Sequence, residues 1–112
     1  DMALILRAAV ANDTFRRIDT TTSYEFPAIK NAAAHTITMG HKMMYKTDSR
    51  YYEGIIGGKT GYTSKAGNTL VTAVERDGVR LIAVVMKAKG THYTDTKAML
   101  DYGFALHAAG KI

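Results

Sequence analysis

A lysine, a threonine and a glycine stand in a row at residues 59–61, inside the stretch Gly57–Ser64, which reads GGKTGYTS. A lysine ammonium beside hydroxyl groups supplies positive charge and hydrogen-bond donors, which suit a carboxylate ligand. Glycine weakens the interior of a strand and often marks the close approach of a ligand or of another backbone. The alternative is a plain surface turn. The combination favours a strand along which an anionic substrate lies.

The length and composition of the chain limit its architecture. It has 112 residues, of which 46% are hydrophobic and 22% are charged. These proportions are typical of one small globular domain with a modest core. The longest strictly apolar run, Leu81–Met86, is far too short to span a bilayer. Because cysteine is absent, disulfides and thiolate metal sites are excluded.

The charge pattern argues against a nucleic-acid partner, although the formal net charge is +5. The fifteen lysines and arginines are scattered, and the densest pair is Arg16-Arg17. Nucleic-acid recognition requires a clustered basic patch instead. The four histidines, at positions 35, 41, 92 and 107, lack the close spacing of a zinc site. We therefore expect no metal, and histidines that are exposed or partly buried.

Three extended segments in the second half predict an antiparallel meander. They are Ile55–Thr63, Asn68–Glu75 and Arg80–Met86, all rich in β-branched or apolar residues. The Asp77-Gly78 pair between the last two is typical of a tight hairpin turn. The short link Ser64–Gly67 joins the first two. Together they predict a three-stranded sheet.

Helices are expected at both ends of the chain. Apolar residues from Met2 to Val10 recur at helical spacing, and Asn12-Asp13 would stop that helix. Thr94-Asp95 would cap a final helix that ends near Gly110. Its apolar stripe is predicted to include Met99, Tyr102, Gly103 and Leu106.

The region between residues 13 and 50 carries weaker signals. Ser23–Pro27 is predicted to be extended and to end at the only proline. His35–Met39 alternates as a strand does, and Gly40 ends it. The run Met43-Met44-Tyr45 is predicted to lie in the core, where methionine commonly fills gaps.

Lys-Thr-Gly on a strand resembles the third signature of the serine penicillin-binding proteins and class A β-lactamases. The whole chain is similar to the D-alanyl-D-alanine carboxypeptidases, the low-molecular-mass penicillin-binding proteins. The matching segments, in the expected order, are Asp1–Ile5, Gly40–Met44, Gly54–Thr63, Arg80–Val85 and Leu100–Phe104. The resemblance implies an α+β fold, a β-lactamase-like antiparallel sheet with flanking helices. Residues 1–112 would be its C-terminal part, with about three sheet strands and the N- and C-terminal helices.

The other two signatures of that family, Ser-x-x-Lys and Ser-x-Asn, are absent. The residues three positions after Ser23, Ser49 and Ser64 are phenylalanine, tyrosine and glycine, so none of these serines has the lysine that the motif requires. The resemblance therefore places the nucleophile upstream of Asp1, in a longer parent protein. We expect this chain to hold no nucleophile and to be inactive alone.

The resemblance implies roles for five residues of the Lys-Thr-Gly strand. Lys59 would supply positive potential to the absent serine and lysine. Thr60 and Thr63 would offer hydroxyls to the terminal carboxylate of the substrate. The strand, including Gly61, would pair with the substrate backbone as an added strand. The backbone N–H of Tyr62 would be one of two oxyanion-hole donors.

His92 lies near the position at which many relatives carry a carboxylate-binding arginine. The local sequence is Lys89-Gly90-Thr91-His92-Tyr93, with no arginine. His92 or Lys89 would replace the arginine only in part, because neither matches a planar guanidinium. The alternative is that His92 is an exposed loop residue without a role in binding.

The parent activity implied by the resemblance is removal of the terminal D-alanine from peptidoglycan stem peptides. The reaction runs through an acyl-serine intermediate that penicillins trap, and it needs no cofactor. Stem peptides and β-lactams would be the ligands. The parent would act outside the cytoplasmic membrane and is often membrane-anchored in the family. The partner of this chain would be the N-terminal fragment of the same protein or another copy of itself.

Two alternatives stay open. A fragment of a class A β-lactamase would share Lys-Thr-Gly but should carry a deacylating glutamate in a preceding loop. Only Glu25 and Glu53 precede Lys59, and neither lies in a convincing loop motif. The second alternative is a non-enzymatic basic binding module, complete in itself, whose binding to an anionic polymer would weaken steeply with salt.

Overall fold

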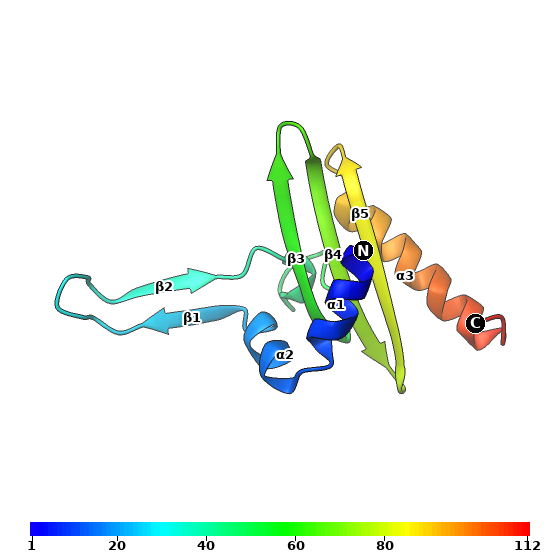
Figure 1. Ribbon diagram of the computed structural model, residues 1–112, viewed down its shortest axis with the longest axis horizontal. Helices are drawn as coiled ribbons and strands as arrows, with labels where there is room; N and C mark the ends of the chain where they lie inside the picture. The colour runs from blue at the N-terminus through cyan, green and yellow to red at the C-terminus, as the bar shows by residue number, and fades with distance from the viewer.

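Three antiparallel strands form the centre of the molecule: β3 (Ile55–Thr63), β4 (Gly67–Arg76) and β5 (Val79–Ala88). The computed structural model, which describes residues 1–112, orders them β3-β4-β5. Figure 1 shows β3 and β5 at the two edges of this sheet. The predicted meander is confirmed, and its second and third strands are slightly longer than the sequence pattern indicated.

The turn between β4 and β5 has the conformation that its sequence predicts. Asp77 and Gly78 have φ angles of 51° and 78°. A two-residue turn with both central residues at positive φ matches the twist of the strands that it joins. The turn therefore fixes the pairing that begins with Arg76 opposite Val79.

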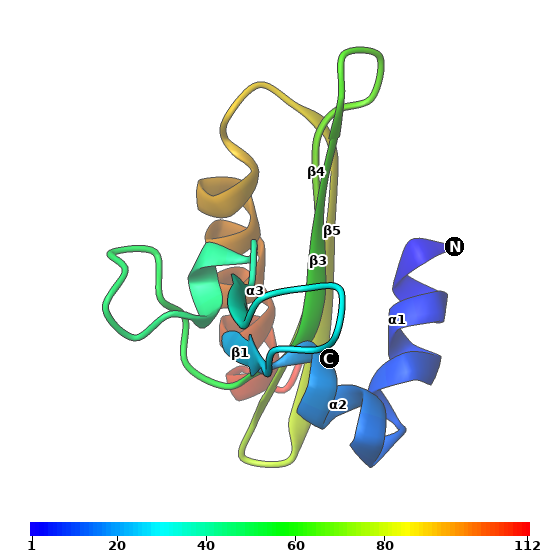
Figure 2. The ribbon, with the colours of Figure 1, turned by 90° about the vertical axis from the view of Figure 1, so that its left-hand side faces the viewer.

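Helices cover both faces of the sheet. Figure 2 shows α1 (Met2–Val10) and α2 (Asp13–Asp19) on one face and α3 (His92–Ala108) on the other. None of the helices combines the length and apolar character that a membrane crossing requires. The buried residues form one cluster on each face. The cluster on the α3 side consists of Met43, Tyr52, Leu70, Val74, Ala83, Val85 and Leu100, and the cluster on the α1 side of Leu6, Val10, Ile56 and Ala73.

The residues expected to end the first helix also begin a second one. Asn12 caps α2, because its side-chain oxygen accepts a hydrogen bond of 2.9 Å from the backbone N–H of Phe15. Asparagine serves both as a stop signal and as a preferred N-cap. Only the first of these roles entered the prediction, so α2 was not predicted.

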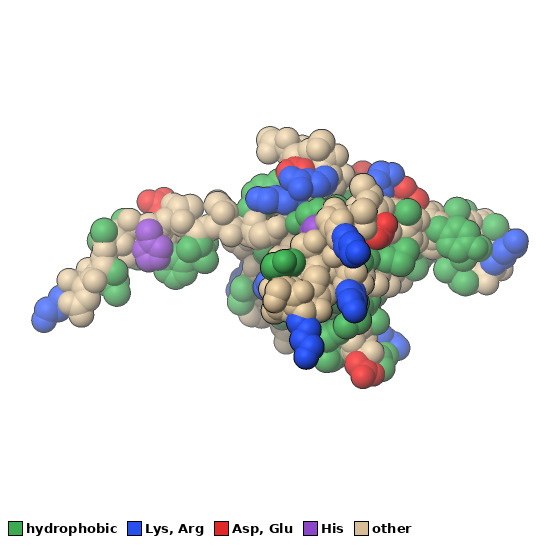
Figure 3. Space-filling view, turned by 90° about the horizontal axis from the view of Figure 1, so that it is seen from above, with side chains coloured by type: hydrophobic (Ala, Val, Ile, Leu, Met, Phe, Trp, Pro, Cys, Tyr) green, Lys and Arg blue, Asp and Glu red, His purple; other side chains and the backbone are tan.

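A two-stranded hairpin projects from the body of the molecule. Its strands β1 (Ser23–Phe26) and β2 (His35–Thr38) pair antiparallel, with Ser23 opposite Thr38. Figures 1 and 3 show the hairpin as an arm that extends past the β3 edge, with hydrophobic side chains on its surface. Both extended segments were predicted, but their pairing was not. The short 3-10 helix η1 (Lys42–Met44) follows, and its two methionines are buried, as predicted.

The start of the final helix differs from the prediction. The N-cap is Thr91, and His92 is the first helical residue. Thr94 and Asp95 lie in the first turn, where each bonds back to Thr91. The Thr94 hydroxyl donates to the Thr91 carbonyl at 3.0 Å, and the Thr91 hydroxyl donates to the Asp95 carboxylate at 2.9 Å. The cap was predicted at Thr94, three residues after the N-cap that the structure shows at Thr91.

The face that α3 buries also differs from the prediction. Leu100 is 1% exposed, whereas Met99 is 43% and Tyr102 is 66% exposed. Thr96 is buried one turn before Leu100, and its hydroxyl donates to the His92 carbonyl at 2.7 Å. Because Thr96 is polar, the spacing of apolar residues alone does not identify the face of α3 that is buried.

Gly103, a residue of the predicted apolar stripe, packs directly against the sheet. A Cβ atom added there would lie 2.8 Å from Leu81 Cδ1 on β5. Glycine therefore lets α3 approach the sheet closely at this position.

Replacing Leu100 with alanine should lower the free energy of unfolding of the full-length parent by about 2–5 kcal/mol, because a cavity opens against the sheet. The adjacent change Met99→Ala is the matched control and should cost less than about 1 kcal/mol, since this side chain is exposed at the surface. Chemical denaturation measures both values. A loss for Met99→Ala equal to that for Leu100→Ala would contradict the assigned face.

Candidate functional site

The β3 strand has one edge paired with β4 and one edge without a strand partner (Figure 1). In an antiparallel strand, the N–H and C=O of alternate residues point to the same side. The N–H of Gly58 points to the free edge, because it donates a 2.6 Å hydrogen bond to Asp19 Oδ2. By alternation, the N–H groups of Thr60 and Tyr62 point there too.

The predicted site residues are therefore brought together along one edge. Lys59 is exposed, and its Nζ bends along the strand to donate a hydrogen bond to the Thr60 carbonyl. The N–H groups of Thr60 and Tyr62 remain available, so the edge offers two backbone donors beside one ammonium group. Such an edge can pair with an extended peptide that carries negative charge.

Thr63, a predicted carboxylate ligand, is engaged locally. Its hydroxyl accepts a hydrogen bond of 2.9 Å from the backbone N–H of Ala66, in the link between β3 and β4. This bond organises the turn but leaves the hydroxyl hydrogen free to donate.

Two glycines of the strand make room for other parts of the same chain. A Cβ on Gly57 would lie 2.8 Å from Val10 Cγ1, and a Cβ on Gly58 would lie 2.7 Å from His41 Cδ2. Contacts this short are incompatible with a side chain at either position. A close approach was predicted at these glycines, and the neighbours are α1 on one face of the sheet and His41 on the other.

Gly61 has a cross-strand reason to be glycine. It pairs with Thr69 of β4, and a Cβ on Gly61 would lie 2.5 Å from Thr69 Oγ1. The neighbouring β4 side chain thus occupies the space beside the backbone at the middle of the predicted site. Gly61 therefore avoids a clash with Thr69 and leaves no side chain of its own at this point of the strand.

The expectation that all histidines are exposed or partly buried is wrong for His41. This side chain is fully buried under β3, where Nε2 and Thr72 Oγ1 share a hydrogen bond of 2.8 Å. Its Nδ1 is buried without a hydrogen-bond partner. Burial, with a smaller contribution from His92, lowers the pKa of His41 to about 4. His41 is therefore neutral near pH 7.

Tyr93 links the start of α3 to the loop that carries His41. Its hydroxyl donates to the Gly40 carbonyl at 3.1 Å and accepts from the Lys42 N–H at 3.2 Å. Its ring meets the His41 ring edge-on at 5.9 Å. Gly40 in turn lies against Thr60, since a Cβ added to Gly40 would be 3.2 Å from Thr60 Oγ1. This chain of contacts holds the Lys-Thr-Gly strand from behind.

The structure places His92 at the first turn of α3, where it is partly buried instead of lying in an exposed loop. Its ring packs on Tyr93 with 4.4 Å between centroids, and its Nδ1 is buried without a partner. No hydrogen bond joins His92 or Lys89 to the β3 edge. A carboxylate-binding role for His92 stays a prediction.

Asp19 is a site residue that the sequence analysis missed. It is the last residue of α2, it is half-buried, and it occupies the Gly58 N–H at the free edge. Burial raises the pKa of Asp19, opposed by the Gly58 hydrogen bond and the charge of Lys59. No local motif marks this residue, because its partner lies 39 positions away.

A groove of about 740 Å³ lies between α2 and the hairpin arm. Its lining is mainly apolar and reaches Gly40, which adjoins Thr60. The lining consists of Arg17, Ile18, Thr21, Tyr24, Phe26, Ile37, Thr38, Met39 and Gly40.

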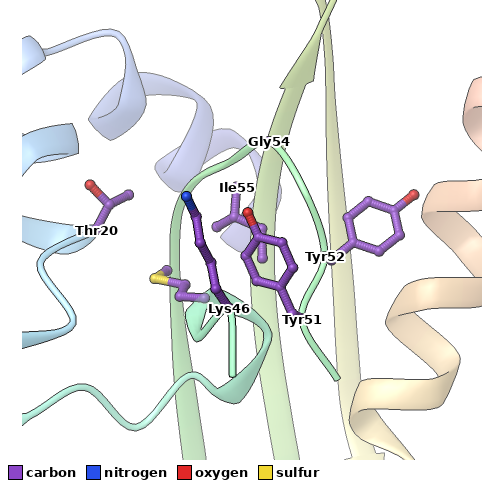
Figure 4. A pocket seen from close by; sticks show the side chains of 7 residues that line it. Thr20, Lys46, Tyr51, Tyr52, Gly54 and Ile55 are labelled. Atoms are coloured by element: carbon purple, nitrogen blue, oxygen red, sulfur yellow. The ribbon is translucent and has the colours of Figure 1, made fainter. Parts of the chain in front are cut away.

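A smaller hollow of about 110 Å³ lies at the start of β3 (Figure 4). The side chains of Lys46 and Tyr51 lie beside one another over Ile55, whereas Tyr52 points away toward α3, where its hydroxyl bonds Asp101 at 2.8 Å. Lys59 lines neither this hollow nor the groove, and its side chain is exposed.

Comparison with known proteins decides the family. Residues 1–90 match the family described as D-alanyl-D-alanine carboxypeptidase. The chain belongs to this family. The match spans α1, the hairpin and all three strands of the central sheet, including the Lys-Thr-Gly segment.

Individual relatives agree with the family match. D-alanyl-D-alanine carboxypeptidase DacB2 of Mycobacterium tuberculosis is 37% identical over 119 residues, which cover 100% of this chain and 38% of the relative. The crystal structure of a D-alanyl-D-alanine carboxypeptidase from the same species superposes with a TM-score of 0.74 at 34% identity, covering 91% of this chain and 38% of that one. A DD-transpeptidase from Streptomyces gives a TM-score of 0.80 at 29% identity, covering 93% and 40%.

These findings confirm the family resemblance and the α+β fold expected from it. They also show that the chain spans about two fifths of the length of these relatives. The matching region contains the strand with the free edge.

The buried neutral His41 makes stability depend on pH. In the unfolded chain, histidine titrates near pH 6.5, whereas folded His41 titrates near pH 4, so the unfolded state binds the proton first. The stabilisation is present above pH 6.5 and is lost as the pH falls through 4. Between pH 7 and pH 4, His41 should account for about 3 kcal/mol of lost stability.

The variant His41→Asn, which cannot titrate, should show a smaller loss between these pH values by about that amount. The control His35→Asn alters an exposed histidine of the hairpin and should retain the wild-type pH dependence. Unfolding of the full-length parent at both pH values measures the difference. Parallel pH dependences for wild type and His41→Asn would contradict the burial of a neutral His41.

Proposed function

We propose that residues 1–112 form the C-terminal part of the catalytic domain of a serine-type D-Ala-D-Ala carboxypeptidase. The free edge of β3 carries this proposal, because it presents Lys59 and the outward N–H groups of Thr60 and Tyr62 in one row. The parent removes the terminal D-alanine from peptidoglycan stem peptides through an acyl-serine intermediate, and penicillins acylate the same serine. The parent acts on the outer side of the cytoplasmic membrane, where peptidoglycan lies.

The edge orients the substrate by strand pairing. A stem peptide lies antiparallel to β3, so that its backbone bonds to the outward groups that β4 leaves free. The Tyr62 N–H donates to the carbonyl oxygen of the scissile bond. As the serine attacks, negative charge develops on that oxygen, and a donor already in place stabilises the transition state.

The positive end of the site binds the substrate carboxylate. The Thr60 hydroxyl donates to the terminal carboxylate, and the hydroxyl of Thr63 is a second donor on the same strand. Lys59 supplies the charge, because its exposed ammonium lies beside the Thr60 carbonyl. Gly61 keeps the strand free of a side chain between the carboxylate and the scissile carbonyl.

Replacing Lys59 with alanine in the full-length parent should slow acylation by penicillin about a hundredfold or more, as expected for removal of one electrostatic stabiliser of the transition state. Lys65→Ala is the matched control: it removes the same charge from the exposed link after β3 and should change the rate less than about threefold. Stopped-flow acylation kinetics measure both. Equal rates for wild type and Lys59→Ala would show that the signature match is accidental.

The second edge of the sheet supports a proposal about the partner. β5 has β4 as its only strand neighbour, and its Met86 is 69% exposed. On the α1 face, Leu4 and Ile5 are 62% and 60% exposed. Unpaired strand edges and exposed apolar side chains favour association with another chain. The N-terminal fragment of the parent, or another copy of this chain, would cover these surfaces.

Sedimentation of the purified chain should therefore show self-association, and mixing with the N-terminal fragment of the parent should restore penicillin binding. A dilute monomer with a cooperative thermal transition would contradict the proposed association. The two fragments separately serve as controls and should bind no penicillin covalently.

A further inference from the structure

We propose that Asp19 determines where a bound peptide must end, and thereby restricts the site to substrates whose chain stops at the carboxylate held by Thr60. Asp19 is in this sense a specificity-determining residue that closes the free edge of β3. This inference rests on the proposed function, because it assigns the limit of the same substrate-binding edge.

One of the outward N–H groups of β3 is already hydrogen-bonded within the chain, and the others are free. The outward N–H groups belong to Gly58, Thr60 and Tyr62, and successive ones are about 6.6 Å apart, two residues of an extended strand. Asp19 Oδ2 accepts the Gly58 N–H at 2.6 Å, a short bond that leaves this donor unavailable. The usable edge therefore ends at Thr60.

The direction of the substrate brings its C-terminus to this point. An antiparallel peptide with its scissile carbonyl at Tyr62 and its carboxylate at Thr60 runs toward Gly58 as it approaches its end. A residue added after that carboxylate would have to pair at Gly58. Its carbonyl would find no free N–H there and would face the Asp19 carboxylate, which is acceptor against acceptor and leaves a polar group unpaired.

Asp19 is held firmly enough to act as such a stop. The Thr20 hydroxyl and N–H both bond the Arg16 carbonyl, which closes the end of α2 directly after Asp19. Gly57 allows α2 this close to the strand, since a Cβ there would be 3.1 Å from Asp19 Oδ2. Burial raises the pKa of Asp19, and the nearby charge of Lys59 opposes this shift.

The arrangement separates two kinds of peptide by chemistry. A terminal carboxylate at Thr60 is attracted by Lys59 and needs nothing from Gly58. An internal peptide bond at the same place is neutral, gains less from Lys59 and places its next residue against Asp19. The site is thus matched to a peptide end and rejects a continuing chain.

The test compares two peptides on the full-length parent. One ends in D-Ala-D-Ala, and the other has one further glycine after the same sequence. The measured quantity is the kcat/KM for cleavage of the longer peptide after its first D-Ala, divided by the kcat/KM for cleavage after the same residue of the shorter peptide. Asp19→Ala should raise the relative cleavage of the longer peptide tenfold or more.

Asp13 has an exposed carboxylate in the first turn of the same helix. The variant Asp13→Ala is therefore the matched control and should leave the ratio unchanged. Asp19→Ser provides the same comparison if the alanine variant does not fold. A ratio that stays at the wild-type value in the folded variant would overturn the assignment of Asp19. A general loosening of the site would slow both peptides together and would also leave the ratio unmoved.

The two proposals fail in different ways. If the wild-type parent neither cleaves the shorter peptide nor reacts with penicillin, the proposed function is wrong. If the wild type does both and the Asp19 variants keep its ratio, only the inference about Asp19 is wrong. A raised ratio supports both.

Discussion

The structure depends on one constraint: every backbone N–H and C=O of β3 needs a partner, and β4 supplies partners on one side only. On the other side, Asp19 takes the Gly58 N–H and Lys59 takes the Thr60 carbonyl. The N–H groups of Thr60 and Tyr62 remain. In the proposed function, these two unpaired donors set the position of the ligand.

Packing from both faces of the sheet keeps this edge in place. α1 and α2 reach the strand at Gly57, and the buried His41 reaches it at Gly58. The fully buried imidazole of His41 carries a cost in folding free energy, because its Nδ1 has no hydrogen-bond partner and burial disfavours its protonated form. Its bond to Thr72 and the contacts of Tyr93 connect β3 to β4 and to α3, so that the strand cannot shift without moving the sheet.

Local signals made the sheet predictable. Alternation, β-branched residues and the Asp77-Gly78 turn all act over a few neighbouring residues, and so they located the three strands and the Lys-Thr-Gly segment. The buried His41, the Asp19 contact and the true face of α3 depend on residues far apart in the sequence. His41 and Thr72 are 31 positions apart, and nothing near either residue indicates their pairing. The polar Thr96 conceals the buried face of α3 for a related reason, because its hydroxyl is satisfied inside its own helix.

We propose that a ligand binds along the free edge of β3. A crystal structure of the full-length parent acylated by a penicillin would show whether it does. We expect the acyl carbonyl oxygen to lie about 3 Å from the backbone nitrogen of Tyr62, within hydrogen-bonding distance. An acyl group whose oxygen points away from β3, with the Tyr62 N–H bonded to another part of the protein, would contradict it.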